Sequence, residues 1–329
     1  MSVIHANNIL SLKQLYLWGL TTLRAVGITN AGLEARILLA HVLNKSQEDL
    51  LLLLYQDLPF TSCVIEKFTD SIAQRSNFMP IAYITNHREC YGLPFYIDSS
   101  VLIPRADTEI IIECAVDYLN NHHRMTTSKL DDAVTTVKTK PIEICEIGVG
   151  SGCILLSVLM SVKATDILAT GIDISSQAIS VAQKNAQLLF NQKTPPQINW
   201  IVGDMFEVLE KRSRHKSHDV KEDFICTDGF DVIISNPPYI PTTQKHLMAR
   251  ETLLYEPQLA LFASDNGYEF YHRIAKESKR FLKTDGVIML EVGFDQAHKV
   301  TAIFTQHGFH LAQQRKDLSN IIRVLCFIL

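Results

Sequence analysis

The regular alternation of short apolar runs and amphipathic stretches over residues 106–329 constrains the fold most. The apolar runs are rich in Ile and Val, as expected of strands that are buried on both faces. They lie at 142–147, 167–173, 198–203, 230–234, 286–292, 309–313 and 321–328. Helical patterns separate most of them, at 110–119, 153–162, 176–190, 267–282 and 296–307. This order predicts an α/β domain with a doubly wound, mostly parallel sheet of seven strands.

The residues before this domain fall into two segments with different sequence patterns. Between Ser11 and Ser76, Leu and Ala recur at three- and four-residue spacing, which predicts a small helical domain over residues 1–79. Residues 80–105 instead carry short strand-like pieces between turn residues, which predicts a β-hairpin connector. These pieces lie at 81–84, 90–97 and 101–104. Residues 121–140 and 211–229 are polar and are expected to be insertions in the domain that follows.

Composition narrows the class of protein. The chain has 329 residues, 47% of them hydrophobic, and a formal net charge of −4, so it can bury a large core and shows no basic excess for nucleic acid. The seven cysteines are odd in number and form no C-x-x-C pair, which predicts reduced thiols in a cytoplasmic protein and no metal site. No apolar run approaches the length of a membrane span, so no membrane partner is expected.

A glycine-rich loop follows the strand predicted at 142–147, with glycines at 148, 150 and 152. The next predicted strand ends in Asp173, about 20 residues after the loop. A strand, glycine turn, helix, strand and terminal acid in this order seat a ribose-bearing cofactor, with the carboxylate on the ribose hydroxyls. The loop and Asp173 are therefore candidate cofactor residues.

The spacing argues against a dinucleotide cofactor. The dinucleotide pattern would place its third glycine at 153, which is Cys here. Alternating glycines instead let the backbone approach a compact ligand. Glu146 would repel a phosphate but could help to neutralise the ammonium of an amino-acid-like cofactor.

The strand predicted at 198–203 ends in Gly203-Asp204. A carboxylate there could accept a hydrogen bond from an adenine amino group, with Met205 or Phe206 against the ring. Asp204 could equally be the N-cap of the next helix, and the two roles are compatible.

The stretch Asn236-Pro237-Pro238-Tyr239 directly follows the strand predicted at 230–234. Proline has a fixed φ and no N–H, so the loop is stiff and rich in hydrogen-bond acceptors. A planar NH2 group needs two acceptors at fixed angles, and Tyr239 can supply a flat face beside it. The alternative is a turn that merely ends a strand, because Asn-Pro and Pro-Pro are common in loops.

These strand-end motifs together resemble the class I S-adenosylmethionine-dependent methyltransferases that act on an NH2 nitrogen. Longer segments resemble the release factor glutamine methyltransferases, the HemK/PrmC family, over nearly the whole chain outside 121–140 and 211–229. Those segments lie at 34–43, 80–84, 91–97, 101–109, 256–257, 267–271 and 291–296. Three residues depart from the usual pattern of the family: Val149, Ala106 and Met205.

The resemblance implies N5-methylation of the glutamine in the Gly-Gly-Gln motif of peptide chain release factors, with S-adenosylmethionine as cofactor. Asn236, Pro237 and Tyr239 would be catalytic and, with Pro238, would bind the glutamine. Cofactor contacts would come from the loop, from the two strand-end acids and from Asn236. Those cofactor residues are Glu146, Gly148, Val149, Gly150, Ser151, Gly152, Asp173, Asp204, Met205 and Asn236.

Three alternatives remain open at this point. A ribosomal-protein glutamine methyltransferase would share Asn-Pro-Pro-Tyr and part of the connector. A DNA or RNA amino-methyltransferase would share Asn-Pro-Pro-Tyr but would want a basic target-recognition region, of which only the Lys211–Lys216 cluster is present, so no nucleic-acid substrate is expected. A non-enzymatic binding scaffold is the third, because fold does not fix function.

Overall fold

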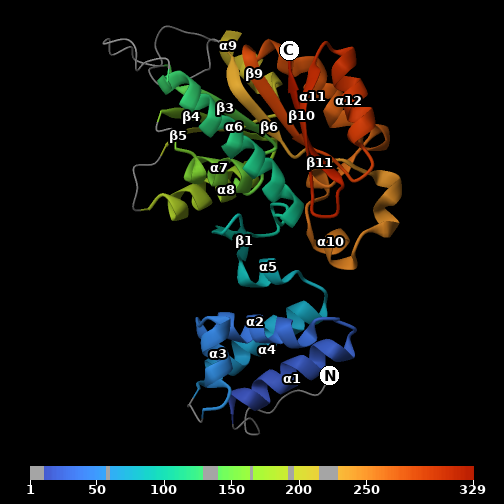
Figure 1. Ribbon diagram of the computed structural model, residues 1–329. Helices are drawn as coiled ribbons and strands as arrows, with labels where there is room; N and C mark the ends of the chain where they lie inside the picture. Colours follow the sequence, from blue (N-terminus) through green and yellow to red (C-terminus); the bar gives the residue numbers. More distant parts are fainter. Residues whose placement is uncertain (1–10, 57–59, 129–139, 164–165, 192–195, 215–228) are drawn as a thin grey trace. The chain divides into compact units, whose positions relative to one another are not determined.

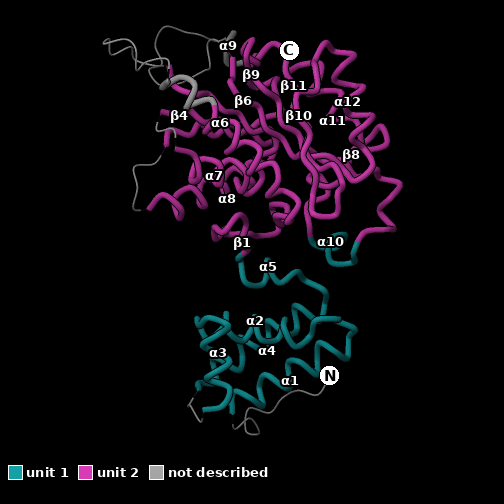
Figure 2. Tube along the Cα trace, in the orientation of Figure 1, with its two compact units in different colours: residues 1–87, 249–255 teal, residues 88–248, 256–329 magenta. Residues whose placement is uncertain are grey.

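The computed structural model describes residues 11–56, 60–128, 140–163, 166–191, 196–214 and 229–329 (Figure 1). Much of the two predicted insertions, residues 129–139 and 215–228, lies outside the described residues. The chain forms two compact units (Figure 2). The first comprises residues 1–87 and 249–255, and the second comprises residues 88–248 and 256–329.

The first unit is helical. Its helices are α1 (Leu12–Ala25), α2 (Ala31–Leu43), α3 (Gln47–Leu53), α4 (Ser62–Ser76), α5 (Ile81–Thr85) and α10 (Arg250–Tyr255). The apolar faces of α1 to α5 meet in one core cluster, because leucines at three- and four-residue spacing share a helix face. The cluster includes Leu15, Leu23, Leu38, Leu39, Phe68 and Ile72.

The strand predicted at 81–84 is wrong, because this segment is the short helix α5. The N–H groups of Tyr83 and Ile84 both donate to the Pro80 carbonyl, and Asn86 ends the helix in the left-handed region. Ile81 and Ile84 pack against the helical core. Tertiary packing therefore outweighs the β propensity of the two isoleucines.

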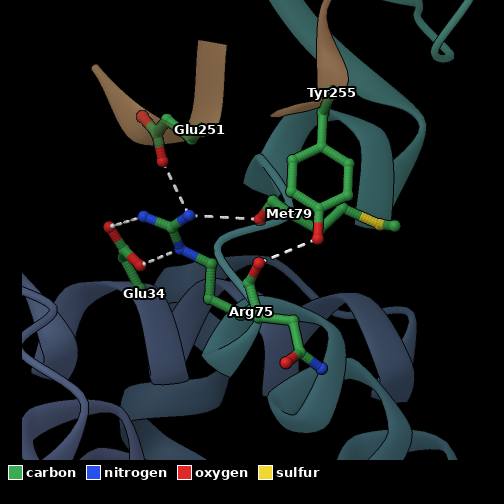
Figure 3. Close-up of polar contacts among 6 residues, drawn as sticks. Glu34, Arg75, Met79, Glu251 and Tyr255 are labelled. Carbon is green, nitrogen blue, oxygen red and sulfur yellow. Dashed lines mark hydrogen bonds and ion pairs between the residues drawn. The ribbon is translucent and has the colours of Figure 1, made fainter. Parts of the chain in front are cut away.

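A buried arginine ties α10 into the helical unit (Figure 3). Arg75 on α4 donates from Nε to Glu34 at 2.6 Å and from Nη1 to Glu251 on α10 at 2.7 Å. Nη1 also donates to the carbonyl of Met79 at 3.1 Å. The Tyr255 hydroxyl, at the end of α10, donates to the carbonyl of Asn77 at 2.8 Å. A segment distant in sequence is thus part of this unit through polar contacts.

We expect Arg75→Ala to lower the free energy of unfolding of the helical unit by about 3 kcal/mol, because it leaves the largely buried Glu34 carboxylate without its cation. Urea denaturation followed by Trp18 fluorescence in a Trp200→Phe background would report this unit. Lys67→Ala is the matched control, since Lys67 is exposed on the same helix. Equal stability of the Arg75→Ala and Lys67→Ala proteins would contradict the role of Arg75.

The second unit contains the seven-stranded sheet that the sequence predicts. Its strands are β3 (Ile142–Ile147), β4 (Ile167–Asp173), β5 (Gln197–Val202), β6 (Phe230–Ser235), β9 (Leu282–Glu291), β10 (His310–Lys316) and β11 (Ile322–Ile328). The order across the sheet is β10-β11-β9-β6-β3-β4-β5. Strands β3, β4, β5, β6 and β9 are parallel, and β11 pairs antiparallel with β9 and β10.

Helices cover the sheet. They are α6 (Glu109–Ser128), α7 (Cys153–Ser161), α8 (Ser176–Leu189), α9 (Glu207–Arg214), α11 (Glu269–Glu277) and α12 (Ala297–Gln306). Helices α11 and α12 pack together and share a buried core with Ile233 of β6 (Figure 1). The β6 neighbours Val232 and Ile234 are also fully buried, so both faces of this strand are covered. Helix α6 begins one residue before its predicted start and runs nine residues beyond its predicted end at 119.

The predicted hairpin is present but short, with β1 (His87–Cys90) paired to β2 (Leu93–Tyr96). Tyr91 and Gly92 between them have φ of 52° and 70°, as a two-residue type I′ turn requires. The strand predicted at 101–104 is wrong. The Ile103 N–H donates to the buried Glu256 carboxylate instead of a strand neighbour. No described helix combines the length and apolar character that a membrane crossing requires.

Candidate active site

Two loops predicted to carry function leave adjacent strands of the sheet. Strand β3 leads into the glycine loop and β6 into Asn-Pro-Pro-Tyr, and Ile147 pairs in register with Ser235. The buried Ser235 hydroxyl donates to the Ile147 carbonyl at 2.8 Å. From β3 the chain goes to β4 and β5 on one side, and β6 then returns on the other side. The two loops therefore flank the point where the strand order reverses, which is where open α/β sheets bind ligands.

The glycine loop presents backbone to open space. Gly148, Gly150 and Gly152 have φ of 75°, 53° and 80°. A Cβ added at Gly148 or Gly150 would meet no atom within 4 Å, whereas at Gly152 it would meet Leu156 of α7 at 3.0 Å. The first two glycines thus leave room for a ligand, and the third permits close packing of loop and helix. The buried Val149 anchors the loop to β4 by donating its N–H to the Ile172 carbonyl at 3.0 Å.

Asp173 joins the loop to the end of β4. One carboxylate oxygen accepts from the Gly150 N–H and the other from the Ser175 N–H, both at 2.9 Å. Burial raises the pKa of Asp173, while these backbone hydrogen bonds oppose the rise. The Ile174 N–H bonds to this carboxylate as well, and a carboxylate has about four lone-pair sites, so the group can still accept from a ligand hydroxyl.

Glu146 lies beneath the loop with only 1% of its surface exposed. Its carboxylate accepts from the Leu155 N–H in the first turn of α7 at 2.9 Å, and burial raises the pKa of Glu146 well above its usual value. In the described structure it therefore caps a helix. Its predicted contact with a ligand ammonium stays a prediction.

Asn185 was missed by the sequence analysis. This fully buried residue on α8 donates from Nδ2 to the Ser151 carbonyl at 2.9 Å and to the Tyr96 carbonyl at 3.0 Å. Its Oδ1 accepts from the Tyr96 N–H at 2.7 Å. One asparagine thus ties the glycine loop to the hairpin strand β2.

The predicted adenine-side residues lie at the end of β5. Asp204 forms an ion pair with Arg273 of α11 at 2.9 Å and keeps 38% of its side chain exposed. Met205 has a φ of 45° and belongs to the buried core of the unit. Asp204 therefore remains accessible to a ligand, while Met205 packs mainly against the protein.

Contacts with Gln296 and Gly267 hold the Asn-Pro-Pro-Tyr loop in place. The Tyr239 carbonyl accepts from Gln296 Nε2 at 3.0 Å, and a Cβ at Gly267 would lie 2.2 Å from the same oxygen. Pro237 is buried, whereas Asn236 and Pro238 are partly exposed. Only glycine fits at position 267, and the loop geometry depends on it.

Comparison with known proteins agrees with this geometry. A family model described as the PrmC N-terminal domain matches residues 14–85. The release factor glutamine methyltransferase of Clostridium acetobutylicum is 32% identical over 295 residues, which cover 89% of both chains. The chain belongs to the release factor glutamine methyltransferase family. The resemblance read from the sequence and the class I methyltransferase fold are thereby confirmed.

Two further matches bear on function. The bifunctional methyltransferase of Rickettsia prowazekii is 40% identical over 318 residues, which cover 96% of this chain and 57% of that protein. The chain thus spans little more than half the length of the bifunctional relatives it matches. A second family model, the Eco57I restriction-modification methylase, matches residues 169–292.

Two buried polar residues contact the Asn-Pro-Pro-Tyr loop in this member of the release factor glutamine methyltransferase family. The sequence alone singled out neither of them. Asn236 Nδ2 donates to Thr108 Oγ1 at 3.4 Å, and the Tyr239 hydroxyl donates to Glu291 Oε1 at 3.4 Å. Thr108 and Glu291 are each 2% exposed. Glu291 is the last residue of β9, the strand beside β6, and an acid at such a strand end was a signal for a site residue. Among the described residues, no His, Cys, Asp and Glu side chains gather into a group that could bind a metal ion.

Burial raises the pKa of Glu291 to about 7, although hydrogen bonds from Thr108 and Tyr239 and the charge of Arg323 oppose the rise. The nearby Asp107 adds to it. The ionised form is therefore costly in the folded protein, while the unfolded chain ionises near the ordinary pKa of glutamate.

This pKa predicts a pH dependence of stability. A raised folded-state pKa gives stability that is full below about pH 4.5 and is lost as pH rises through about 7. We expect the free energy of unfolding of the wild type, relative to Glu291→Gln, to fall by about 3 kcal/mol over this window. Urea titrations of both proteins between pH 4.5 and 8 would measure the difference. A constant difference would contradict the raised pKa.

We expect Gly267→Ala to displace the Asn-Pro-Pro-Tyr loop and to slow at least tenfold any methyl transfer that the protein catalyses, because the new Cβ would clash with the Tyr239 carbonyl. Gly308→Ala is the matched control. Gly308 has φ of 84°, close to the 89° of Gly267, but faces only the end of Lys279 at 3.5 Å. Equal activity of the two variants would show that the contact at Gly267 does not matter.

Proposed function

We propose that the protein transfers a methyl group from S-adenosylmethionine to the side-chain nitrogen of the glutamine in the Gly-Gly-Gln motif of a peptide chain release factor. The observation that carries the proposal is the placement of Asn236-Pro237-Pro238-Tyr239 next to the glycine loop, at the point where the strand order reverses. Membership of the family supports the same reaction, since the relative in Clostridium acetobutylicum is called a release factor glutamine methyltransferase.

The cofactor would be held by residues at the ends of four strands, β3, β4, β5 and β6. The open backbone at Gly148 and Gly150 leaves room for its methionine part, with Val149, Ser151 and Gly152 completing the loop. Asp173 would accept from the ribose hydroxyls, while Asp204 and Met205 would border the adenine. Glu146 and Asn236 complete the proposed set. S-adenosylmethionine would supply a methyl carbon activated by a positively charged sulfur.

Catalysis would rest on positioning. An amide nitrogen is a poor nucleophile because its lone pair is delocalised. The Asn236 side-chain oxygen and the Pro237 carbonyl would accept the two amide hydrogens, with Pro238 and Tyr239 shaping the pocket. These preorganised acceptors aim the nitrogen and favour the positive charge that develops on it. The nitrogen gains the methyl group as the carbon–sulfur bond breaks, and then releases a proton to solvent.

Three parts of the chain would have separate roles in this reaction. We assign binding of the substrate protein to the helical residues 1–79, the role of connector to residues 80–105, and methyl transfer to residues 106–329. Because release factors act in translation, we place the reaction in the cytoplasm and expect no membrane partner.

A second candidate function is methylation of an amino group on a nucleic-acid base. The match of residues 169–292 to the Eco57I restriction-modification methylase favours it, since this range contains Asn-Pro-Pro-Tyr. The net charge of −4 opposes it. Labelled S-adenosylmethionine offered with purified release factors, ribosomal proteins and DNA would decide among the substrates. We expect label on the Gly-Gly-Gln glutamine, mapped by mass spectrometry, and label on DNA alone would overturn the proposal.

We expect Asn236→Ala to slow methyl transfer tenfold to a hundredfold, because a lost hydrogen bond of about 1.5–3 kcal/mol corresponds to such a factor. Cofactor affinity, measured by calorimetry with S-adenosylhomocysteine, should change less. Gln187→Ala, an exposed position on α8, is the control for handling and folding. A wild-type rate for Asn236→Ala would contradict the assigned role.

A further inference from the structure

Four side chains form a row of polar contacts that begins and ends in the Asn-Pro-Pro-Tyr loop and whose two middle members, Thr108 and Glu291, are buried. Asn236 Nδ2 lies 3.4 Å from Thr108 Oγ1, and a hydrogen bond from the Thr108 side chain to Glu291 lowers the pKa of that carboxyl. The Tyr239 hydroxyl donates to Glu291 Oε1. Glu291 Oε2 is buried and has no hydrogen-bond partner. Asn236 and Tyr239 belong to the proposed substrate pocket. Thr108 and Glu291 do not.

The hydrogen bonds among these four side chains run in a fixed direction from donor to acceptor. With its pKa near 7, Glu291 is ionised above neutral pH and its carboxylate then only accepts, so both the Tyr239 and the Thr108 hydroxyl groups must point their hydrogens at Glu291. The Thr108 oxygen then faces Asn236 with a lone pair, and only the NH2 end of the Asn236 amide can meet it. The Asn236 oxygen is consequently left for a ligand.

The position of Thr108 is itself held by its neighbours. Thr108 is the last residue of a short 3-10 helix, Ala106–Thr108, and its N–H donates to the Arg105 carbonyl at 3.1 Å. Arg105 pairs with the buried Glu256 at 2.6 Å, and Asp107 pairs with Arg323 at 2.9 Å. A residue fixed on both sides in this way can fix the rotation of a partner side chain.

We propose that Thr108 is a positioning residue for methyl transfer: by accepting from Asn236 Nδ2 and donating to Glu291, it turns the Asn236 oxygen toward the substrate amide. The inference rests on the proposed function, because it assigns Asn236 the role of acceptor. Without Thr108 the Asn236 amide can flip, and its NH2 group then faces the NH2 group of the substrate, where two donors cannot bond.

Kinetics of a double-mutant cycle test the proposal. Thr108→Val keeps the shape and removes the hydroxyl, and we expect it to lower kcat about tenfold with little change in cofactor affinity. Thr108→Ser keeps the hydroxyl and should retain most of the activity. In an Asn236→Ala background, Thr108→Val should cause no further loss, because Thr108 acts only through Asn236. Losses that multiply, or a Thr108→Ser protein as slow as Thr108→Val, would overturn the inference.

A second measurement does not depend on activity or on the variants folding. In the wild-type protein, nuclear Overhauser contacts should join the Asn236 amide hydrogens to the Thr108 methyl group. Their absence would overturn the inference even if the protein methylates release factors. Their presence in a protein that methylates no glutamine would instead refute the proposed function and leave the orientation of Asn236 standing.

Discussion

The site depends on one constraint of sheet topology: β3 and β6 are parallel neighbours whose connections leave in opposite directions. Because their carboxyl ends meet at the same edge, the glycine loop and Asn-Pro-Pro-Tyr begin at the same register position, directly after the pair of Ile147 and Ser235. The buried hydrogen bond from Ser235 to the Ile147 carbonyl fixes that register at the last paired residues. Everything that the two loops do together depends on this spacing.

Buried and half-buried carboxylates hold the surrounding loops in place. Glu146 caps α7, Asp173 binds the glycine loop, and Glu256 binds the Ile103 N–H and Arg105. Glu291 does the same for Tyr239. A buried carboxylate is costly unless it accepts hydrogen bonds, so each is bonded to a backbone N–H or a side-chain donor. This arrangement exchanges some stability for loops with a single geometry, as a preorganised site requires.

The sequence predicted the parts of this structure that repeat a local rule. Strands β3 and β4 have the bounds that their apolar runs indicated, because buried parallel strands show their burial in every residue. Ile81–Thr85 was misread because two isoleucines in a short apolar run suit a strand or a helix equally, and packing decided. Asn185, Thr108 and Glu291 were missed for another reason. Their partners lie far away in sequence, so no spacing indicates the contacts, and only the place of Glu291 at a strand end was a signal.

The central claim is that Asn236 presents an oxygen to a carboxamide beside the cofactor. The most direct measurement is a crystal structure with S-adenosylhomocysteine and a peptide containing Gly-Gly-Gln. The account predicts that the glutamine side-chain nitrogen lies within hydrogen-bond distance of Asn236 Oδ1 and of the Pro237 carbonyl. A glutamine seated elsewhere, or an Asn236 amide with its nitrogen toward the substrate, would contradict it.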